Sequence, residues 1–379
     1  MKKLVLAAAV LGFSALSASA VEKAPLKIGA LLAVTGPAAF LGAPEARTLE
    51  MLVEELNAKG GIDGRKIQLV VKDTTGSPEK AVSFAKQLIE EEQVFAIIGP
   101  ATSGETLQIK AIVEEAKALL ISCAAAEKIV DPVAAHVFNV APKDRYAAEM
   151  IFRQMKKMGV KKFGLLSSNT GFGKAGKEQV EKGAAAAGLE IAANEVYDKA
   201  ATDLTAEVTK LKAAGVDAIL NWSIEPAQAI VIKNARQIGL TIPIFQSHGF
   251  ANIQYARTAG AAAEGVMFPA SRIVVADALP AKHPQKAVVM AYKSAYEKKY
   301  KEDVSTFGGH AWDSLQILVR AVKQAGLDRE KVRGAIENMK GHVGTAGVFN
   351  YSPTDHNGLT IDAFAMLTVK DGKFVMLGE

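Results

Sequence analysis

Residues 94–122 read VFAIIGPATSGETLQIKAIVEEAKALLIS and contain one complete strand–loop–helix–strand unit. Residues 94–98 form an apolar run that predicts a buried strand, and a loop rich in glycine and hydroxyl side chains follows it. Residues 106–117 then predict a helix, and residues 119–122 predict a second buried strand. Apolar strands separated by amphipathic helices are typical of a parallel sheet covered on both faces, so the unit indicates an α/β fold.

The same alternation runs through the segments before and after this unit. Before it, strands are predicted at residues 27–34 and 67–71, with one helix built on an apolar stripe and another opened by an N-cap serine and a proline (Leu49, Leu52, Val53, Leu56; Ser77, Pro78). After Pro142, four strands alternate with four helices, at residues 163–167, 189–196, 218–222 and 244–246, and at residues 146–158, 174–187, 204–214 and 226–238. Two consecutive sets predict two doubly wound parallel-sheet lobes.

The alternation breaks after residue 269. Residues 277–341 are mainly helical, with helices predicted at residues 287–300, 307–325 and 328–340. Residues 361–369 and 373–377 predict a β-hairpin, because Asp371-Gly372 has the composition of a type I′ turn.

The first twenty residues predict export from the cytoplasm. Lys2 and Lys3 precede an apolar run at residues 4–16, which is too short to span a bilayer and is followed by small residues up to Ala20. This pattern is typical of a secretory signal peptide cleaved after Ala20, and no cysteine follows it to carry a lipid anchor. We therefore expect residues 21–379 to work in the periplasm, as two domains.

The composition argues against several other classes of protein. The 45 Lys and Arg residues exceed the 40 Asp and Glu residues only slightly, and the excess is spread out, so nucleic acid is not an expected partner. The single cysteine, Cys123, permits no intramolecular disulfide and is expected to be a small buried side chain. We predict no metal site, no cofactor and no enzymatic activity, because no catalytic set can be assigned and the six histidines are widely scattered (His136, His248, His283, His310, His342 and His356).

Ligands of open α/β sheets bind beyond the carboxyl ends of the strands, so the loops at those ends are the candidate sites. Thr102 and Ser103 lie at such a loop, where free N–H groups and the positive end of a helix dipole favour a carboxylate. An ordinary helix N-cap is the alternative explanation of these hydroxyls. The small residues 123–126 after the next strand either let a ligand approach the backbone or form a tightly packed turn.

The second set of elements contains a pattern of glycines that resembles a nucleotide site. Gly171, Gly173 and Gly176 match G-x-G-x-x-G, but they begin several residues past the strand, whereas the dinucleotide fingerprint needs the tight turn at the strand end. We therefore predict no dinucleotide there. Trp222 and His248 follow two further strands, where they either line a cleft or pack inside the lobe.

More specific motifs are spread over nearly the whole of residues 21–379: Gly29-Ala30, Thr35-Gly36-Pro37, Gly42, Asn57-Ala58-Lys59-Gly60-Gly61-Ile62-Asp63-Gly64-Arg65, Asp73, Pro78, Ala81, Ile98-Gly99, Ser103 and Ala262-Ala263-Glu264-Gly265. With these motifs and this order of elements, the chain resembles the branched-chain amino-acid-binding family of periplasmic proteins, which serve ABC transporters. The resemblance implies a type I periplasmic-binding-protein fold, in which three hinge strands join two lobes that are each discontinuous in sequence. It places hinges near residues 139–143, 267–271 and 349–353, an N-terminal lobe at residues 21–141 and 270–350, and a C-terminal lobe at residues 142–269 and 351–379.

The resemblance also implies where the ligand is held. In this family a hydroxyl and backbone amides of the first lobe hold the ligand carboxylate, and side chains of the second lobe close over it. The candidate ligand-binding residues here are Ser103, Ala124, Ala126, Phe172, Trp222, Ile224, His248, Thr102 and Leu41. Besides His248, three of them depart from the family pattern, because Ala126 replaces a threonine, and Phe172 and Ile224 stand where tyrosine is common.

His248 is the most informative departure, because amino-acid binders of this family place a glutamate there to pair with the ligand ammonium. A histidine cannot supply that negative charge, and an unpaired buried ion costs several kcal/mol. We therefore predict a small organic acid without an α-amine, such as an aromatic acid or a branched 2-oxo acid, bound by a monomer and delivered to a membrane ABC permease. The alternatives are a genuine branched-chain amino-acid binder and a ligand-sensing subunit of a membrane receptor.

Overall fold

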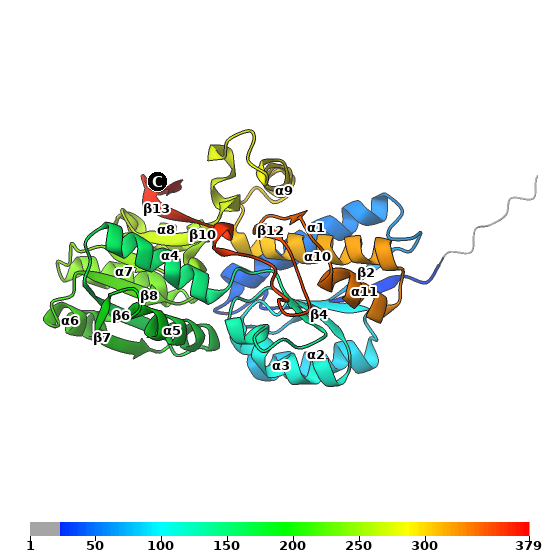
Figure 1. Ribbon diagram of the computed structural model, residues 1–379, viewed down its shortest axis with the longest axis horizontal. Helices are drawn as coiled ribbons and strands as arrows, with labels where there is room; N and C mark the ends of the chain where they lie inside the picture. The colour runs from blue at the N-terminus through cyan, green and yellow to red at the C-terminus, as the bar shows by residue number, and fades with distance from the viewer. Residues whose placement is uncertain (1–22, 379) are drawn as a thin grey trace, which may run out of the picture.

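The computed structural model describes residues 23–378, which form two lobes that are each built on their own sheet (Figure 1). The predicted signal peptide lies outside these residues. One sheet has the strand order β2-β1-β3-β4-β5, the other has the order β14-β13-β10-β9-β8-β6-β7, and β11 pairs with β12 in a separate ribbon. We call the part built on the five-stranded sheet the first lobe and the part built on the seven-stranded sheet the second lobe.

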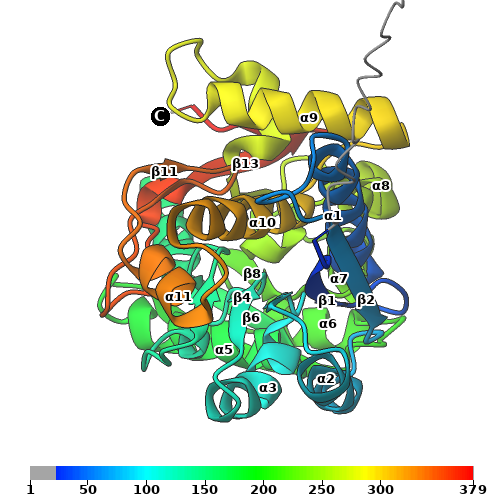
Figure 2. The ribbon, with the colours of Figure 1, turned by 90° about the vertical axis from the view of Figure 1, so that its right-hand side faces the viewer.

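The first sheet is parallel throughout, as predicted. Its elements are β1 (Leu26–Leu32), α1 (Ala39–Ala58), β2 (Ile67–Asp73), α2 (Pro78–Lys86) with the π-helical turn Gln87–Glu91, β3 (Ala96–Ile98), α3 (Ser103–Glu115), β4 (Leu119–Ser122), the 3-10 turn Glu127–Ile129 and β5 (Val137–Asn139). Side chains of a strand alternate between its two faces, so Ile97 packs with α2 and α3 while Ile98 packs into the core on the opposite face. Figure 2 shows this layering, with α2 and α3 on one side of the sheet and α1 on the other.

The second sheet has five parallel strands and a C-terminal antiparallel hairpin. Its elements are α4 (Asp144–Lys157), β6 (Lys162–Ser168), α5 (Gly171–Ala184), β7 (Glu190–Tyr197), α6 (Thr205–Ala213), β8 (Ala218–Trp222), α7 (Ala227–Gln237), β9 (Ile244–Gln246), the 3-10 turn His248–Phe250, α8 (Ile253–Ala259), the 3-10 turn Gly260–Ala263, β10 (Met267–Ser271), β13 (Phe364–Lys370) and β14 (Lys373–Met376). The predicted hairpin turn is confirmed, because Asp371 and Gly372 have φ values of 50° and 69°. The predicted start of its first strand was three residues too early, since Ile361–Ala363 forms a 3-10 turn.

The helical region between β10 and β13 packs on the first lobe. It contains the 3-10 segment Arg272–Ala278, α9 (Lys286–Tyr300), α10 (Thr306–Ala325), α11 (Arg329–Glu337), β11 (His342–Val343) and β12 (Val348–Phe349). The apolar face of α10 packs along α1, which explains why the strand–helix alternation stops here (Figure 2). Each lobe therefore contains segments that are distant in sequence, while the precise limits of the two lobes stay a prediction.

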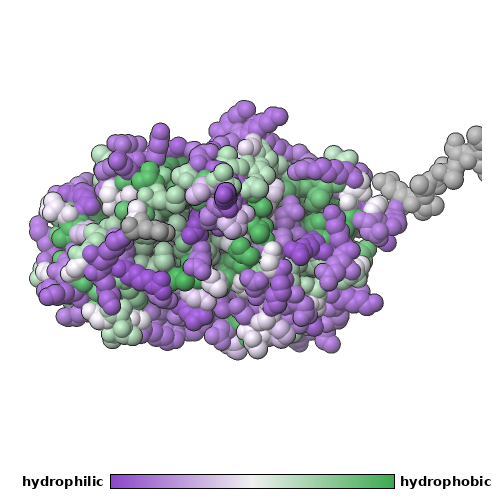
Figure 3. All heavy atoms as spheres, turned by 45° about the horizontal axis from the view of Figure 1, so that its top comes forward, coloured by the Kyte–Doolittle hydropathy of each residue, from purple (hydrophilic) through white to green (hydrophobic). Residues whose placement is uncertain are grey.

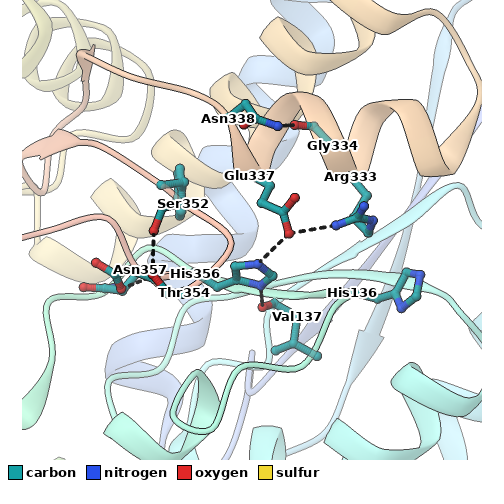
Figure 4. Close-up of polar contacts among 12 residues, drawn as sticks. His136, Val137, Arg333, Gly334, Glu337, Asn338, Ser352, Thr354, His356 and Asn357 are labelled. Carbon is teal, nitrogen blue, oxygen red and sulfur yellow. Dashed lines mark hydrogen bonds and ion pairs between the residues drawn. The ribbon is translucent and has the colours of Figure 1, made fainter.

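The first and third connections between the lobes lie side by side and are held by a polar network (Figure 4). The Nδ1 atom of His356 lies 2.9 Å from the carbonyl oxygen of Val137, and its ring stacks on Phe138 with centroids 4.2 Å apart. Asn357 donates to the side-chain oxygen of Asn139 at 2.6 Å. These bonds tie the segment after β12 to the end of β5, where the resemblance places two hinges.

The surface mixes polar and apolar side chains. Figure 3 shows one face on which charged and polar side chains separate smaller apolar groups. Across residues 23–378, no helix has both the length and the apolar character needed to cross a bilayer.

Candidate functional site

A narrow cavity of about 20 Å³ lies between the lobes, beyond the carboxyl ends of β3 and β4 on one side and of β8 and β9 on the other. Six of the nine predicted ligand-binding residues line it: Leu41, Ser103, Ala124, Phe172, Ile224 and His248. The remaining lining residues were not among these nine. Cys123 and Ala125 come from the loop at residues 123–126 that the sequence offered as a candidate, and the others are Ala101, Ala141, Gly249, Phe307 and His310. The walls are thus mostly apolar, and Ser103, His248 and His310 supply most of the polar atoms.

The wall formed by the first lobe differs from the prediction in its amides. The Ala126 amide donates to the Ser103 hydroxyl at 3.2 Å, and the Ala124 amide donates to the Ser122 hydroxyl at 3.2 Å. In this conformation both amides that the resemblance assigns to the ligand carboxylate have acceptors within the protein, since a buried N–H group takes the nearest available acceptor. Ala126 lies behind the cavity wall, while Ser103 and Ala124 face the cavity.

Thr102 is the N-cap of α3, which was the alternative explanation of its hydroxyl. Its Oγ1 atom accepts from the Glu105 amide at 3.4 Å and donates to the Glu105 carboxylate at 2.5 Å. This cap starts α3 at Ser103, three residues earlier than predicted. Thr102 lines a larger cleft outside the cavity, and Phe172 and Ile224 line both spaces, so these two side chains separate the cavity from the outer cleft.

The wall formed by the second lobe is a cluster of rings around His248. The His248 ring centroid lies 5.3 Å from that of Phe172, 5.8 Å from that of Trp222 and 5.4 Å from that of Phe364. Trp222 is fully buried behind this layer instead of lining the cavity. The indole explains one of the glycines, because a Cβ atom at Gly176 would overlap the Trp222 ring nitrogen.

The ionisable groups of the site are buried, and burial disfavours the charged form of each. Burial, and next the nearby His310, lower the pKa of His248 to about 3, and burial lowers the pKa of His310 to about 4. The Nε2 atom of His248 lies 3.6 Å from Asp144, which is too long for a hydrogen bond. Burial, and next Glu127, raise the pKa of Asp144 well above its usual value.

Sequence reasoning missed Phe307 and His310, which both lie near the start of α10. The sequence signal for them was the start of a predicted helix at residue 307. That helix could be assigned to the first lobe only through the family resemblance. Cys123 is 2% exposed, which confirms the prediction that it is a small buried side chain.

The two lobes touch one another beside the cavity, so the structure is a closed form. Gly104 in α3 faces Gly171 in α5 so closely that a Cβ atom on Gly171 would lie 2.5 Å from the Gly104 Cα atom. Asn252 of the second lobe donates to the Phe40 carbonyl of the first lobe at 2.9 Å, and the Phe40 and Tyr255 rings meet edge to face with centroids 4.9 Å apart.

Comparison with known proteins agrees with this architecture. The sequence model of the periplasmic binding protein family matches residues 25–373. The Leu/Ile/Val-binding protein homolog 7 of Brucella suis is 30% identical over 234 residues, which span 59% of this chain and 58% of that protein, less than two thirds of its length. An extracellular ligand-binding receptor from Rhodopseudomonas palustris HaA2 is 28% identical, with a TM-score of 0.88 over 94% of this chain and 100% of that chain.

A second solved structure links the fold to a known ligand. A branched-chain amino-acid transporter substrate-binding protein from Streptococcus pneumoniae, solved in complex with isoleucine, is 28% identical. Its TM-score is 0.82, over 92% of this chain and 97% of that chain. The chain therefore belongs to the periplasmic binding protein family, which confirms the family and the type I fold that the sequence predicted.

Proposed function

We propose that the protein is the extracytoplasmic binding component of an ABC importer and that it carries a small apolar organic acid. One observation carries the choice of ligand: an apolar interlobe cavity has the Ser103 hydroxyl on one wall and an imidazole, His248, on the wall where amino-acid binders of the family place a carboxylate. The family membership supports a role in binding and delivery, and no chemical reaction is proposed.

The lining of the cavity disfavours an amino acid. Leu41, Phe172, Ile224 and Phe307 supply apolar surface, and none of the lining residues carries a carboxylate. These lining side chains offer an ammonium group no counter-charge, and desolvation of an unpaired ion is costly. A carboxylate attached to a flat ring or a short branched chain suits this apolar lining better, so we expect an aromatic acid or a branched 2-oxo acid.

Asp144 is the observation that favours the alternative, a genuine amino-acid binder. It lies 3.6 Å from His248 and could provide the missing negative charge. We prefer the acid because Asp144 does not line the cavity and because burial raises its pKa.

Domain closure would couple binding to transport. A ligand shifts the balance between open and closed forms only by its difference in affinity for them, so contacts made only in the closed form are decisive. His248 and Phe172 reach the ligand from the second lobe, while Ser103 and Leu41 reach it from the first lobe. We assign the bending to the three connections near residues 139–143, 267–271 and 349–353, and we expect a monomer to present its closed outer faces to the permease.

Calorimetry with the purified protein tests the ligand class. Benzoate and 4-methyl-2-oxopentanoate are the probes, and leucine is the matched amino acid. We expect at least one acid to release or absorb heat and leucine to give no signal, whereas tight leucine binding would refute the ligand class. The variant His248→Glu should weaken acid binding and admit an amino acid. Deletion of the gene separates transport from sensing, because loss of uptake supports an importer and loss of signalling without loss of uptake supports a receptor subunit.

A further inference from the structure

Two buried histidines face the cavity from opposite lobes, and neither has a hydrogen-bond partner within residues 23–378. His310 in α10 is 4% exposed and His248 is 7% exposed, and both ring nitrogens of each lack a partner. The backbone of Cys123 lies beside the His310 ring without a hydrogen bond of normal geometry. Buried polar atoms are nearly always paired, so two unpaired imidazoles on one cavity indicate groups that can hydrogen-bond a bound molecule.

We infer that His310 is a second ligand contact, that it grips the ligand carboxylate together with His248, and that the site takes up one proton from solvent when the acid binds. This inference rests on the proposed function and names how its ligand is held. The balance is simple: the acid enters as a carboxylate, a neutral imidazole gains one proton from water, and the bound pair is neutral overall.

The cavity offers few other ways to compensate a carboxylate. Within the described part of the chain, none of its lining side chains is a lysine or an arginine. The Ala124 and Ala126 amides already donate to serine hydroxyls. The imidazoles are the lining groups that can become positive, and a bound anion raises their pKa from the low values that burial gives them.

The ionisable groups around the two histidines are acidic and buried. They approach from α4, α1, α3 and α10 and from the end of β4, and burial raises the pKa of every one of them: Asp144, Glu45, Glu105, Asp313 and Cys123. Asp144 faces His248, and Cys123 lies beside His310, with Glu45 and Asp313 close to the thiol. None of these acidic groups can give a carboxylate a positive partner, so that charge has to come from an imidazole.

Isothermal titration of the mature protein with benzoate or 4-methyl-2-oxopentanoate at pH 7.5 tests the inference. Titrations in phosphate and in Tris, which differ in ionisation enthalpy, give the number of protons taken up, and we expect about one per acid bound. His310→Phe and His248→Phe should each weaken binding by about 10- to 100-fold, as expected for the loss of a hydrogen bond to a charged group. The double variant His248→Asn/His310→Asn should take up none. His342→Gln is the matched control, because His342 lies outside the cavity beside Arg320, and it should change neither quantity.

The outcomes separate the two proposals. If wild-type protein binds an acid without proton uptake, or if His310→Phe keeps wild-type affinity, the inference is wrong and the ligand class stands. If wild-type protein binds neither acid, the ligand class is wrong and the inference falls with it. His310→Asn keeps an N–H donor of smaller size, so it replaces His310→Phe should the latter fail to fold.

Discussion

Closure of the lobes depends on two glycines that meet across the interface. Gly171 is the first residue of α5, and a Cβ atom there would lie 2.5 Å from the Cα atom and 2.7 Å from the amide nitrogen of Gly104. Both contacts are with backbone, which cannot swing aside as a side chain does. Gly171 does not have a positive φ, so alanine suits its own backbone and the clash arises only between the lobes.

The variant Gly171→Ala should therefore penalise the closed form and spare the fold of each lobe. Overpacking typically costs about 1–3 kcal/mol, and if this cost falls wholly on the closed form, ligand affinity drops by about 5- to 150-fold. Calorimetry with the acid that wild-type protein binds measures the loss, and small-angle X-ray scattering should show less compaction on adding that acid.

Gly334→Ala is the matched control for this experiment. Gly334 lies within α11, and a Cβ atom there would meet no atom within 4 Å. This variant should keep wild-type affinity and gain a little stability from its better helix propensity. The reasoning is refuted if Gly171→Ala binds the acid as tightly and compacts as fully as the wild type.

Three further predictions follow from buried groups. Gly176→Ala should lower the free energy of unfolding by about 1–3 kcal/mol in urea, because its Cβ atom overlaps the Trp222 indole; an unchanged midpoint would contradict this packing. Burial raises the pKa of Asp144 in the folded protein above the value of about 3.9 in the unfolded chain. The protonated carboxyl is therefore compatible with the fold below about pH 3.9, and the free energy of unfolding falls as the pH rises from there toward the folded pKa. Asp144→Asn should thus gain stability relative to wild type by up to about 1.4 kcal/mol per pH unit, measured in urea at pH 5, 6 and 7, and a difference independent of pH would disprove it. Cys123 should react with a thiol reagent at pH 8 only after unfolding, because burial protects it and raises its pKa; rapid labelling of folded protein would show otherwise.

The sequence predicted the strands better than the helix ends. β4, β8 and β9 have the predicted limits, because each is a short apolar run bounded by turn residues. α3 and α5 begin three residues earlier than predicted, because the side chains of Thr102 and Thr170 cap them. A cap depends on local geometry that the apolar pattern does not record.

The candidate site was predicted in part for a similar reason. The loops after β4 and β9 placed Ala124 and His248 at the cavity, because the carboxyl ends of parallel strands share one edge of a sheet. Whether the Ala124 amide stays free depends on the rotamer of Ser122, which no pattern encodes. His310 comes from a helix far along the chain, so its place beside the loop after β4 arises only from the packing of α10 against α1.

Phe172 and Ile224 stand between the inner cavity and the outer cleft, and both belong to the second lobe. A molecule in the inner cavity can thus leave only when the second lobe moves away. Its residence time then depends on how often the two lobes open. The same opening of the lobes then determines both the affinity for the ligand and its release. A permease that pulls the halves apart would free the cargo at its own entrance, and a freely diffusing loaded protein would rarely lose its cargo on the way.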